Sequence, residues 1–414
     1  MDMRANILTM KKYRGLYGKL FNYELDYENK SLIRLEGMDY DTSVFKIPKI
    51  FRYAVNLMFK NNTLTYSDFS GFDRFHNLIK KYEDYRSGVG SKKPFIFVGS
   101  GVSNLVYPTI ESVLDLEKNK KRKTIIIFEP EYPLLTSVAE RLGANIVKVK
   151  ASRENNYIVK FEDIETLIDD SVCAILFSYP NNPTCNFQEK SFFDNLVKVS
   201  KEKDIFIISD EIYRDTFYKK EDYVNIANIN SGYDNFIRIY GTSKDMPGMT
   251  GMRCGYIIGD SIIEDIFLNN QLLRNFSGNI ISEYLFMIDI ALRYYDISNE
   301  IFEDFKYYPK IIIKKYFKTV KKNKARQKKY NEIVVKRLTD NKNVIDVIVP
   351  KSGNAVLFRY HKDMSPEDFQ NHMIEKGLAV YPCDVFSLDE NDGTWGRVCV
   401  TREISYLLKG IDRI

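Results

Sequence analysis

Short apolar runs alternate with helix-like segments through the middle of the chain. The runs occupy residues 95–98, 124–128, 145–149, 172–177, 205–209, 236–240 and 254–259. Segments between them, such as residues 103–118, carry apolar residues at intervals of three and four, which is the spacing of one helix face. Strands that alternate with helices predict a mostly parallel sheet covered on both faces. We therefore expect an α/β domain with a seven-stranded sheet.

The pattern changes after about residue 290. A long charged helix is expected first, then two strands, a helix and a last strand, which together predict a smaller α+β domain. Residues 1–48 have no core pattern of their own and are expected to pack on that domain. The predicted division is therefore an N-terminal segment 1–48, a large domain 49–290 and a small domain 291–414.

The charge of the chain indicates no polyanionic partner. The 414 residues include 61 basic and 56 acidic side chains, a net charge of +5, so neither a nucleic acid nor a membrane is expected as a partner. Residues 310–329 contain ten basic residues and no acidic one. We interpret this run as the solvated face of a long helix; the alternative is a site for an anionic partner.

The cysteine and histidine residues indicate a cytoplasmic protein without a catalytic metal. The five cysteines are widely spaced and form no CxxC pair, which is typical of reduced thiols. None of the three histidines has a Cys, Asp or Glu beside it at metal-ligand spacing. No apolar run approaches the roughly 20 residues of a membrane helix, and the first residues lack a signal-peptide core.

Polar residues follow three of the apolar runs at the point where a strand should end. Asn182 lies in a turn rich in proline and asparagine, Asp210 follows run 205–209, and Lys244 follows run 236–240. Ligands bind at the carboxyl ends of strands in α/β folds, so a site is expected there. Each residue also has an ordinary explanation, since Asp210 could cap a helix and Lys244 could be a surface lysine.

A glycine-containing turn precedes these residues. Residues 99–104, with the sequence GSGVSN, follow a strand and open a helix, but they lack the third glycine of the dinucleotide fingerprint. A nicotinamide cofactor is therefore disfavoured. The backbone N–H groups at such a helix N-terminus could still bind a phosphate.

Four ordered blocks together resemble the aminotransferase class I/II family of fold-type-I enzymes, which use pyridoxal 5′-phosphate (PLP). The blocks are Asn182-Pro183-Thr184-Cys185, Asp210-Glu211-Ile212-Tyr213, Ser243-Lys244 and Gly251-Met252-Arg253-Cys254-Gly255. The resemblance covers residues 60–290 at motif level and the C-terminal part more loosely. It implies a large PLP-binding domain and a smaller α+β domain. Cys185 departs from the family's glycine, and the gap from Lys244 to Arg253 is one residue longer than usual.

The resemblance implies a role for each matching residue. Lys244 would form the Schiff base with PLP and move the proton at the substrate, with Asp210 at the pyridinium nitrogen. Asn182 and Tyr213 would bind the phenolic oxygen, and Tyr132 would stack on the ring. The phosphate would be held by Arg253, Ser243, Val102 and Ser103.

Two further roles concern the substrate and a second subunit. Arg397 matches the arginine that grips the substrate α-carboxylate together with Asn182, and Arg402 is its rival, five residues on. Tyr66 matches a tyrosine that reaches the phosphate of the neighbouring subunit. The resemblance therefore implies a homodimer with shared active sites.

The implied activity is that of an aminotransferase, which moves the amino group of a free amino acid to a 2-oxo acid. The alternative enzymes are PLP-dependent lyases, cyclases and amino-acid oxidases of specialised metabolism, because one fold supports all of these reactions. A non-catalytic binding protein is the remaining alternative, and the presence of Lys244, Asp210 and Arg253 disfavours it.

Overall fold

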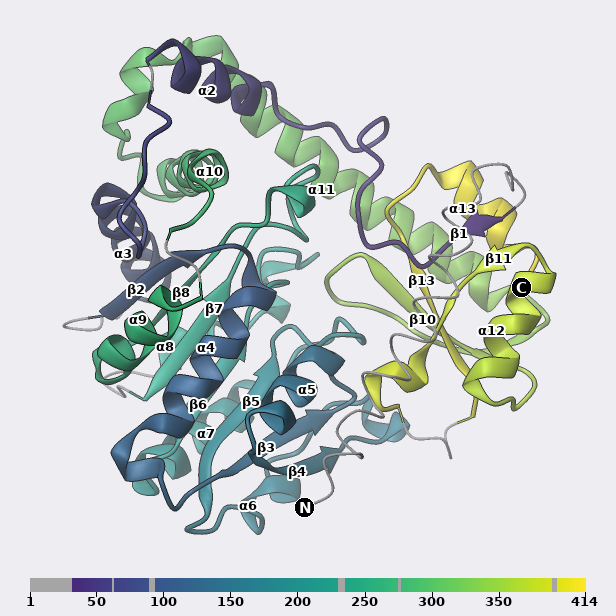
Figure 1. Ribbon diagram of the computed structural model, residues 1–414. Helices are drawn as coiled ribbons and strands as arrows, with labels where there is room; N and C mark the ends of the chain where they lie inside the picture. The colour runs from purple at the N-terminus through teal and green to yellow at the C-terminus, as the bar shows by residue number, and fades with distance from the viewer. Residues whose placement is uncertain (1–31, 62, 89–93, 230–234, 275–276, 389–392) are drawn as a thin grey trace.

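The computed structural model describes residues 32–61, 63–88, 94–229, 235–274, 277–388 and 393–414. Two units lie side by side, a larger one around a seven-stranded sheet and a smaller one around a four-stranded antiparallel sheet (Figure 1). Helix α11 (Lys310–Thr339) extends from one unit to the other. Its Tyr316 belongs to the core of the large unit and its Val334 to the core of the small unit.

The large sheet has the strand order β2-β8-β7-β6-β5-β3-β4. Its strands are β2 (Pro94–Gly99), β3 (Thr124–Glu129), β4 (Asn145–Lys150), β5 (Val172–Ser178), β6 (Phe206–Asp210), β7 (Phe236–Tyr240) and β8 (Gly255–Asp260). Strand β8 runs antiparallel to both of its neighbours, and the other pairs are parallel. The predicted mostly parallel seven-stranded sheet is confirmed.

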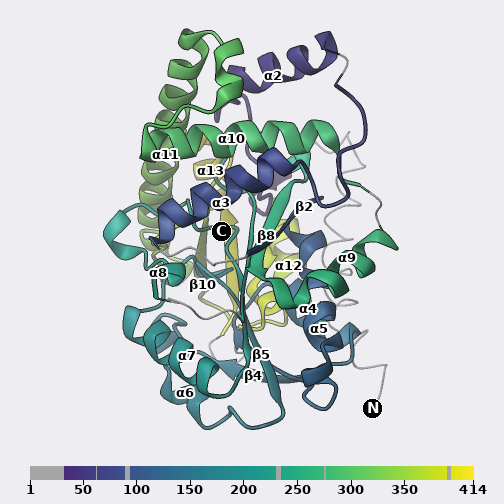
Figure 2. The same cartoon turned by 90° about the vertical axis from the view of Figure 1, so that its left-hand side faces the viewer.

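Helices cover both faces of this sheet, which explains its continuous apolar strands. Alternate residues of β3 enter opposite cores: Ile125 and Ile127 pack on one face, Ile126 and Phe128 on the other. The first face carries α4 (Val102–Asp115), α5 (Pro133–Arg141) and α9 (Glu264–Leu272). The second carries α6 (Glu162–Glu165), α7 (Lys190–Glu202) and α8 (Ile226–Ile229), as the turned view shows (Figure 2).

A third apolar cluster joins further helices to the β2–β8 side of the sheet. These helices are α2 (Lys49–Lys60), α3 (Asp73–Ser87) and α10 (Ile280–Ser298). The predicted domain boundary at residue 290 falls inside α10, which packs along its length with α3 (Figure 2).

The small unit contains a four-stranded sheet with the strand order β12-β13-β10-β9 and a separate pair of short strands, β1 and β11. Its strands are β1 (Ile33–Arg34), β9 (Val344–Ile348), β10 (Ala355–Tyr360), β11 (Leu378–Ala379), β12 (Tyr381–Pro382) and β13 (Trp395–Cys399), and its helices are α12 (Pro366–Glu375) and α13 (Ile404–Ile411). Strand β1 pairs in parallel with β11, so residues 33 and 34 lie on the small unit. Residues 1–31 of the predicted N-terminal segment lie outside the described residues.

The parallel strands β3, β5, β6 and β7 end at one edge of the large sheet, and this edge faces the small unit (Figure 1). Lys244 and the turn at Asn182 follow two of these ends, and Asp210 is the last residue of a third. The described helices include none with the length and apolar content needed to cross a lipid bilayer.

Candidate active site

A cavity of about 470 Å³ lies at this edge, between the large sheet and the small unit. Ten of the eleven residues proposed from the sequence line it. They are Val102, Ser103, Tyr132, Asn182, Asp210, Tyr213, Ser243, Lys244, Arg253 and Arg397. Residues that are up to 295 positions apart in the chain thus share one cavity, because three strand ends, one helix start and β13 converge there.

Lys244 is a partly buried residue in the turn after β7 and is not a surface lysine. The hydroxyl of Tyr40 donates a hydrogen bond of 2.9 Å to its backbone carbonyl, which fixes the turn from the side of the small unit. Burial, with smaller contributions from Arg397 and Arg253, lowers the pKa of Lys244 to about 8. A large share of this amine is therefore neutral near pH 8 and can act as a nucleophile.

Asp210 is a buried carboxylate, only 4% exposed, at the end of β6. Its Oδ1 accepts a hydrogen bond of 3.0 Å from the N–H of Ile212, within a turn that does not continue as a helix. Asp210 is therefore not a helix cap. Burial, reinforced by Glu211, raises the pKa of Asp210 to about 7. Among the described residues no cation lies within ion-pair distance of it.

The first turn of α4 forms the opposite wall. Gly101 precedes the helix with φ +91°, and a Cβ atom there would lie 2.9 Å from Nη2 of Arg253. The glycine therefore allows the guanidinium group to approach the helix N-terminus. The extra residue between Lys244 and Arg253 is accommodated in the short 3-10 turn Thr250–Met252, after which Arg253 takes φ +51°.

A buried acid supports the wall that carries Tyr132 and Asn182. Glu131 accepts hydrogen bonds from the N–H groups of Ser178 (2.7 Å) and Tyr132 (2.6 Å), and the Ser178 hydroxyl also contacts it. Ser178 Oγ in turn accepts a bond of 2.9 Å from the N–H of Asn182. Burial raises the pKa of Glu131 to about 8. This chain of bonds fixes the two cavity residues relative to each other.

Cys185 takes φ +57°, in the left-handed region that favours the glycine usual at this position. Its side chain is buried, and a Cβ atom on Gly353 of the small unit would lie 2.5 Å from its sulfur. Burial raises the pKa of the Cys185 thiol to about 12, so the thiol is protonated at neutral pH. The residue therefore packs the turn against the small unit and does not supply a reactive thiolate.

Arg397 is a buried cation on β13, and its guanidinium carbon lies 4.6 Å from the ring centre of Phe386. In the described part of the chain its Nε has no hydrogen-bond partner, and no carboxylate pairs with it. The rival Arg402 donates to Asp39 Oδ1 at 3.0 Å and does not line the cavity. The geometry therefore makes Arg397 available to an anion, whereas Arg402 is already paired.

Tyr66 is the proposed residue that lies elsewhere. Its side chain is 83% exposed in the loop between α2 and α3, away from the cavity. Its expected contact with a neighbouring subunit stays a prediction.

Several cavity residues were not found from the sequence. They are Arg34, Glu36, Gly37, Met38, Asp39, Ile212, Thr250, Tyr381, Val385 and Phe386. Most belong to the short segment after β1 or to the loop after β12. The alternation of apolar and charged residues in Ile33–Arg34 and the two positions after it is a signal that could have indicated an exposed strand face.

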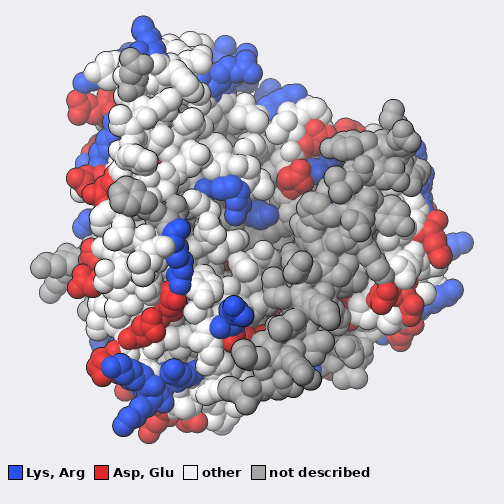
Figure 3. All heavy atoms as spheres, viewed as in Figure 1, with Lys and Arg blue, Asp and Glu red and all other residues white. Residues whose placement is uncertain are grey.

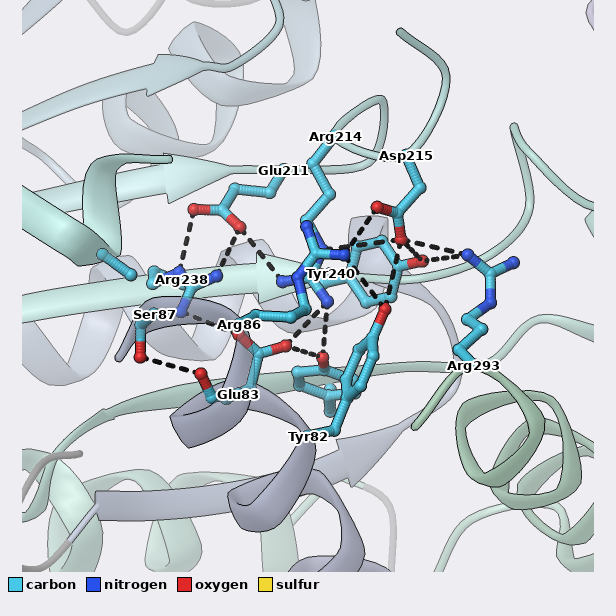
Figure 4. Close-up of polar contacts among 12 residues, drawn as sticks. Tyr82, Glu83, Arg86, Ser87, Glu211, Arg214, Asp215, Arg238, Tyr240 and Arg293 are labelled. Atoms are coloured by element: carbon cyan, nitrogen blue, oxygen red, sulfur yellow. Dashed lines mark hydrogen bonds and ion pairs between the residues drawn. The ribbon is translucent and has the colours of Figure 1, made fainter. Parts of the chain in front are cut away.

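A buried ionic network surrounds Arg214 (Figure 4). Its carboxylates are Glu83, Glu211, Asp215, Asp245 and Asp289, and its guanidinium groups are those of Arg86, Arg214, Arg238 and Arg293. Although burial opposes it, the charges of Arg214 and Arg238 lower the pKa of Glu83 to about 2. The Arg214 guanidinium carbon also lies 3.5 Å from the ring centre of Tyr240.

The network is tied to the cavity through the chain itself. Glu211, Arg214 and Asp245 directly follow Asp210, Tyr213 and Lys244, respectively. Glu211, Arg214 and Asp245 do not line the cavity. Glu211 pairs with Arg238, Arg214 pairs with Glu83 on α3, and Asp245 pairs with Arg293 on α10. The turns that carry the cavity residues are thus anchored from behind.

Comparison with known proteins gives one family and a consistent fold. The family model for aminotransferase class I and II matches residues 38–414. An aspartate aminotransferase of Sulfolobus acidocaldarius is 26% identical over 337 residues, which cover 78% of this chain and 75% of the relative. One from Pyrococcus horikoshii is 24% identical over 89% of this chain and 85% of its own.

Solved structures agree with this assignment at the level of the fold. The aspartate aminotransferase of Thermus thermophilus with maleate superposes with a TM-score of 0.80 at 17% identity, covering 96% of this chain and 94% of that one. The enzyme of Thermotoga maritima gives 0.77 at 21% identity, with 98% and 95% covered. The chain therefore belongs to the aminotransferase class I and II family, whose members are PLP-dependent enzymes that move amino groups between amino acids and 2-oxo acids.

Proposed function

We propose that this chain transfers the α-amino group of a free amino acid to a 2-oxo acid, with PLP attached through Lys244. One observation carries the proposal: a lysine with a lowered pKa, a buried carboxylate and a buried arginine face the same cavity from three separate segments. The cofactor would supply an aldehyde for the Lys244 amine and a cation for the Asp210 carboxylate, and the substrate would supply an anion for Arg397.

The cavity fits PLP on three observations. Gly101 allows Arg253 to approach the first turn of α4, whose N-cap residue makes no side-chain cap bond, so the guanidinium and the helix N–H groups could bind one anion. The buried Asp210 has no cation within ion-pair distance among the described residues, and a protonated ring nitrogen would supply one. Lys244 lines the same cavity as these two groups.

The binding roles follow from the donors available. The N–H groups of Val102 and Ser103, the Ser243 hydroxyl and the Arg253 guanidinium would hold the phosphate. Asn182 and the hydroxyl of the buried Tyr213 would donate to the ring oxygen, and Tyr132 would cover the ring face. PLP, when bound, supplies an electron-accepting ring that stabilises negative charge on the substrate Cα.

The chemical roles fall on Lys244 and Arg397. A pKa of about 8 lets Lys244 take a proton from the substrate Cα and return it nearby at neutral pH. Arg397 offers a planar fork of N–H donors to the α-carboxylate, and the ring of Phe386 limits where that fork can move. The buried network behind Lys244 would keep both turns fixed during these steps.

A homodimer with shared sites forms part of the proposal. The surface over α2, α3 and α10 carries few charged side chains at its centre (Figure 3). The exposed apolar side chains of these helices and of the segments after α2 and α10 include Phe59, Leu64, Tyr66, Tyr85, Ile297, Ile301 and Tyr307. Such a surface favours association, and Tyr66 would then point towards the phosphate of the second subunit. All five cysteines are unpaired, which supports a cytoplasmic location.

The test is a visible spectrum of the purified protein with PLP, followed by titration with amino acids. We expect an absorbing complex that an amino acid converts to the pyridoxamine form and a 2-oxo acid restores. Lys244→Ala should lack the complex, whereas the exposed Lys201→Ala on α7 should keep it. Oxygen uptake or ammonia release without the pyridoxamine form would instead indicate an oxidase or a lyase.

A further inference from the structure

The N-terminal edge of the cavity is an extended segment with two different faces. Ile33 and Leu35 are buried in the apolar core of the small unit, while Arg34 and Glu36 line the cavity. Successive side chains of a strand point to opposite sides, so this alternation follows from the strand geometry of β1 and its continuation. Both side chains on the cavity face are charged.

These two charges form one ion pair that leaves an acceptor unused. Arg34 donates from Nε (2.9 Å) and Nη2 (2.5 Å) to the same oxygen, Oε1 of Glu36. The second oxygen, Oε2, is buried and has no hydrogen-bond partner among the residues that the structure describes. Glu36 itself is 5% exposed, and burial raises its pKa although Arg34 opposes this rise. A buried carboxylate oxygen without a donor is costly, so a ligand that supplies one would be favoured.

The Arg34–Glu36 ion pair lies on the same side of the cavity as Arg397, the proposed site for the substrate α-carboxylate. The thiol of Cys399 donates to the Glu36 carbonyl at 3.0 Å, and Cys399 is two residues beyond Arg397 on β13. Two strand residues span about 7 Å, so the two groups belong to one wall of the cavity. The other side chains of this wall, Tyr381, Val385, Phe386 and Met38, are largely apolar.

A dicarboxylic amino acid needs an unpaired cation for its side-chain carboxylate, whereas this wall of the cavity offers the carboxylate of Glu36. Four cations line the cavity within the described part of the chain. Lys244, Arg253 and Arg397 have roles in the proposed function, and Arg34 is already paired with Glu36. An acidic side chain would meet the Glu36 carboxylate, which repels it. A side chain that ends in N–H groups would find the unused oxygen.

We propose that Glu36 determines specificity by accepting a hydrogen bond from an N–H donor at the end of the substrate side chain. The preferred substrates are then amino acids with a carboxamide, ammonium or guanidinium group, and dicarboxylic amino acids are poor substrates. This inference rests on the proposed function, because it assumes that Arg397 holds the α-carboxylate in the same cavity.

The test compares the PLP-loaded wild type with Glu36→Gln, which keeps the shape of the side chain and removes its charge. The amino-acid panel is asparagine, glutamine, lysine and arginine against aspartate and glutamate, with leucine as a substrate that has no side-chain donor. We expect the wild type to favour the best N–H donor over aspartate by about tenfold or more in kcat/KM, the effect of one charged hydrogen bond. Glu36→Gln should reduce that ratio about tenfold and leave the value for leucine within about twofold.

A binding measurement supplies a readout without turnover. Titration calorimetry with maleate, a dicarboxylate, should show binding that is about tenfold tighter in Glu36→Gln than in the wild type, because a repulsive charge is removed. Glu375→Gln, on the exposed side of α12, is the matched control and should change neither quantity.

The outcomes separate this inference from the proposed function. If the wild type transfers amino groups but prefers aspartate, or if Glu36→Gln leaves the substrate ratio unchanged, the role of Glu36 is refuted and the aminotransferase assignment stands. If no amino acid of the panel converts the PLP complex, the proposed function fails and the inference fails with it. Arg34→Met should strengthen the preference for cationic side chains, and a weaker preference would also contradict the inference.

Discussion

Replacing Asp210 by asparagine should make the protein without PLP more stable at high pH and, at the same time, inactive. The carboxylate is buried and has no nearby cation among the described residues, so its pKa rises from the ordinary 3.8 to about 7. A difference of about three pKa units corresponds to about 4 kcal/mol, at about 1.4 kcal/mol per unit. This is the free energy that folding loses when Asp210 must be ionised.

The sign of the pH dependence follows from the direction of the shift. A carboxyl group with a raised pKa in the folded state stabilises the fold fully below pH 3.8, and this contribution is lost as the pH rises towards 7. At pH 8 the wild type therefore carries almost the whole loss, about 4 kcal/mol, and at pH 5 about 2 kcal/mol. Asp210→Asn has no such charge, so its advantage in unfolding free energy should grow by about 2 to 3 kcal/mol between these pH values.

The assay is urea unfolding of the PLP-free proteins at pH 5 and pH 8, with the exposed Asp115→Asn on α4 as the control. The control should show the same difference from the wild type at both pH values. Excess PLP should cancel the advantage of Asp210→Asn at pH 8, because the wild-type carboxylate then gains a cationic partner. An equal stability difference at pH 5 and pH 8 would refute the assignment of an unpaired buried carboxylate.

Three further predictions test other parts of the site. The rate at which PLP-free protein forms its absorbing complex with PLP should rise about tenfold per pH unit below pH 8 and level off above it, because only the neutral Lys244 amine reacts. Stopped-flow absorbance measures this rate. A rate that does not change with pH would contradict the lowered pKa of Lys244. Arg397→Lys should raise KM about tenfold or more because the planar fork is lost, whereas Arg402→Lys should stay within a few fold in steady-state kinetics. Glu211→Gln should lower the unfolding free energy by about 3 to 5 kcal/mol in urea titrations, because Arg214 and Arg238 lose a buried partner, while Asp194→Asn in an exposed pair should cost about 1 kcal/mol or less.

The sheet was predictable because its strands are buried on both faces and therefore read as continuous apolar runs. Each of the seven runs became a strand, with ends displaced by at most one residue. The antiparallel direction of β8 was not predictable, since an apolar run carries no information on strand direction. The cavity residues at strand ends were predictable as a set, because order and spacing related four motifs to one another.

The rest of the site depends on contacts between distant segments. Arg34 lies on a strand of two residues, too short to show a periodic pattern, and Glu36 lies two positions beyond it. The partner strand is 345 positions away. The charged residues after Asp210, Tyr213 and Lys244 gave no sign that they meet Arg293 in one buried network. The predicted contact of Tyr66 is with a second subunit, so the structure of one chain does not test it.

Helix α11 belongs to two hydrophobic cores at once. With 30 residues it is about 45 Å long, and its first half is packed in the large unit while its last turns are packed in the small unit. A rotation of the small unit about the cavity must therefore bend this helix or turn with it as a rigid lever. The stiffness of one helix thus limits how far the cavity can open and close. A glycine near the middle of α11 would change the shape of the cavity through the angle between the two units, although it contacts neither the cavity nor the substrate.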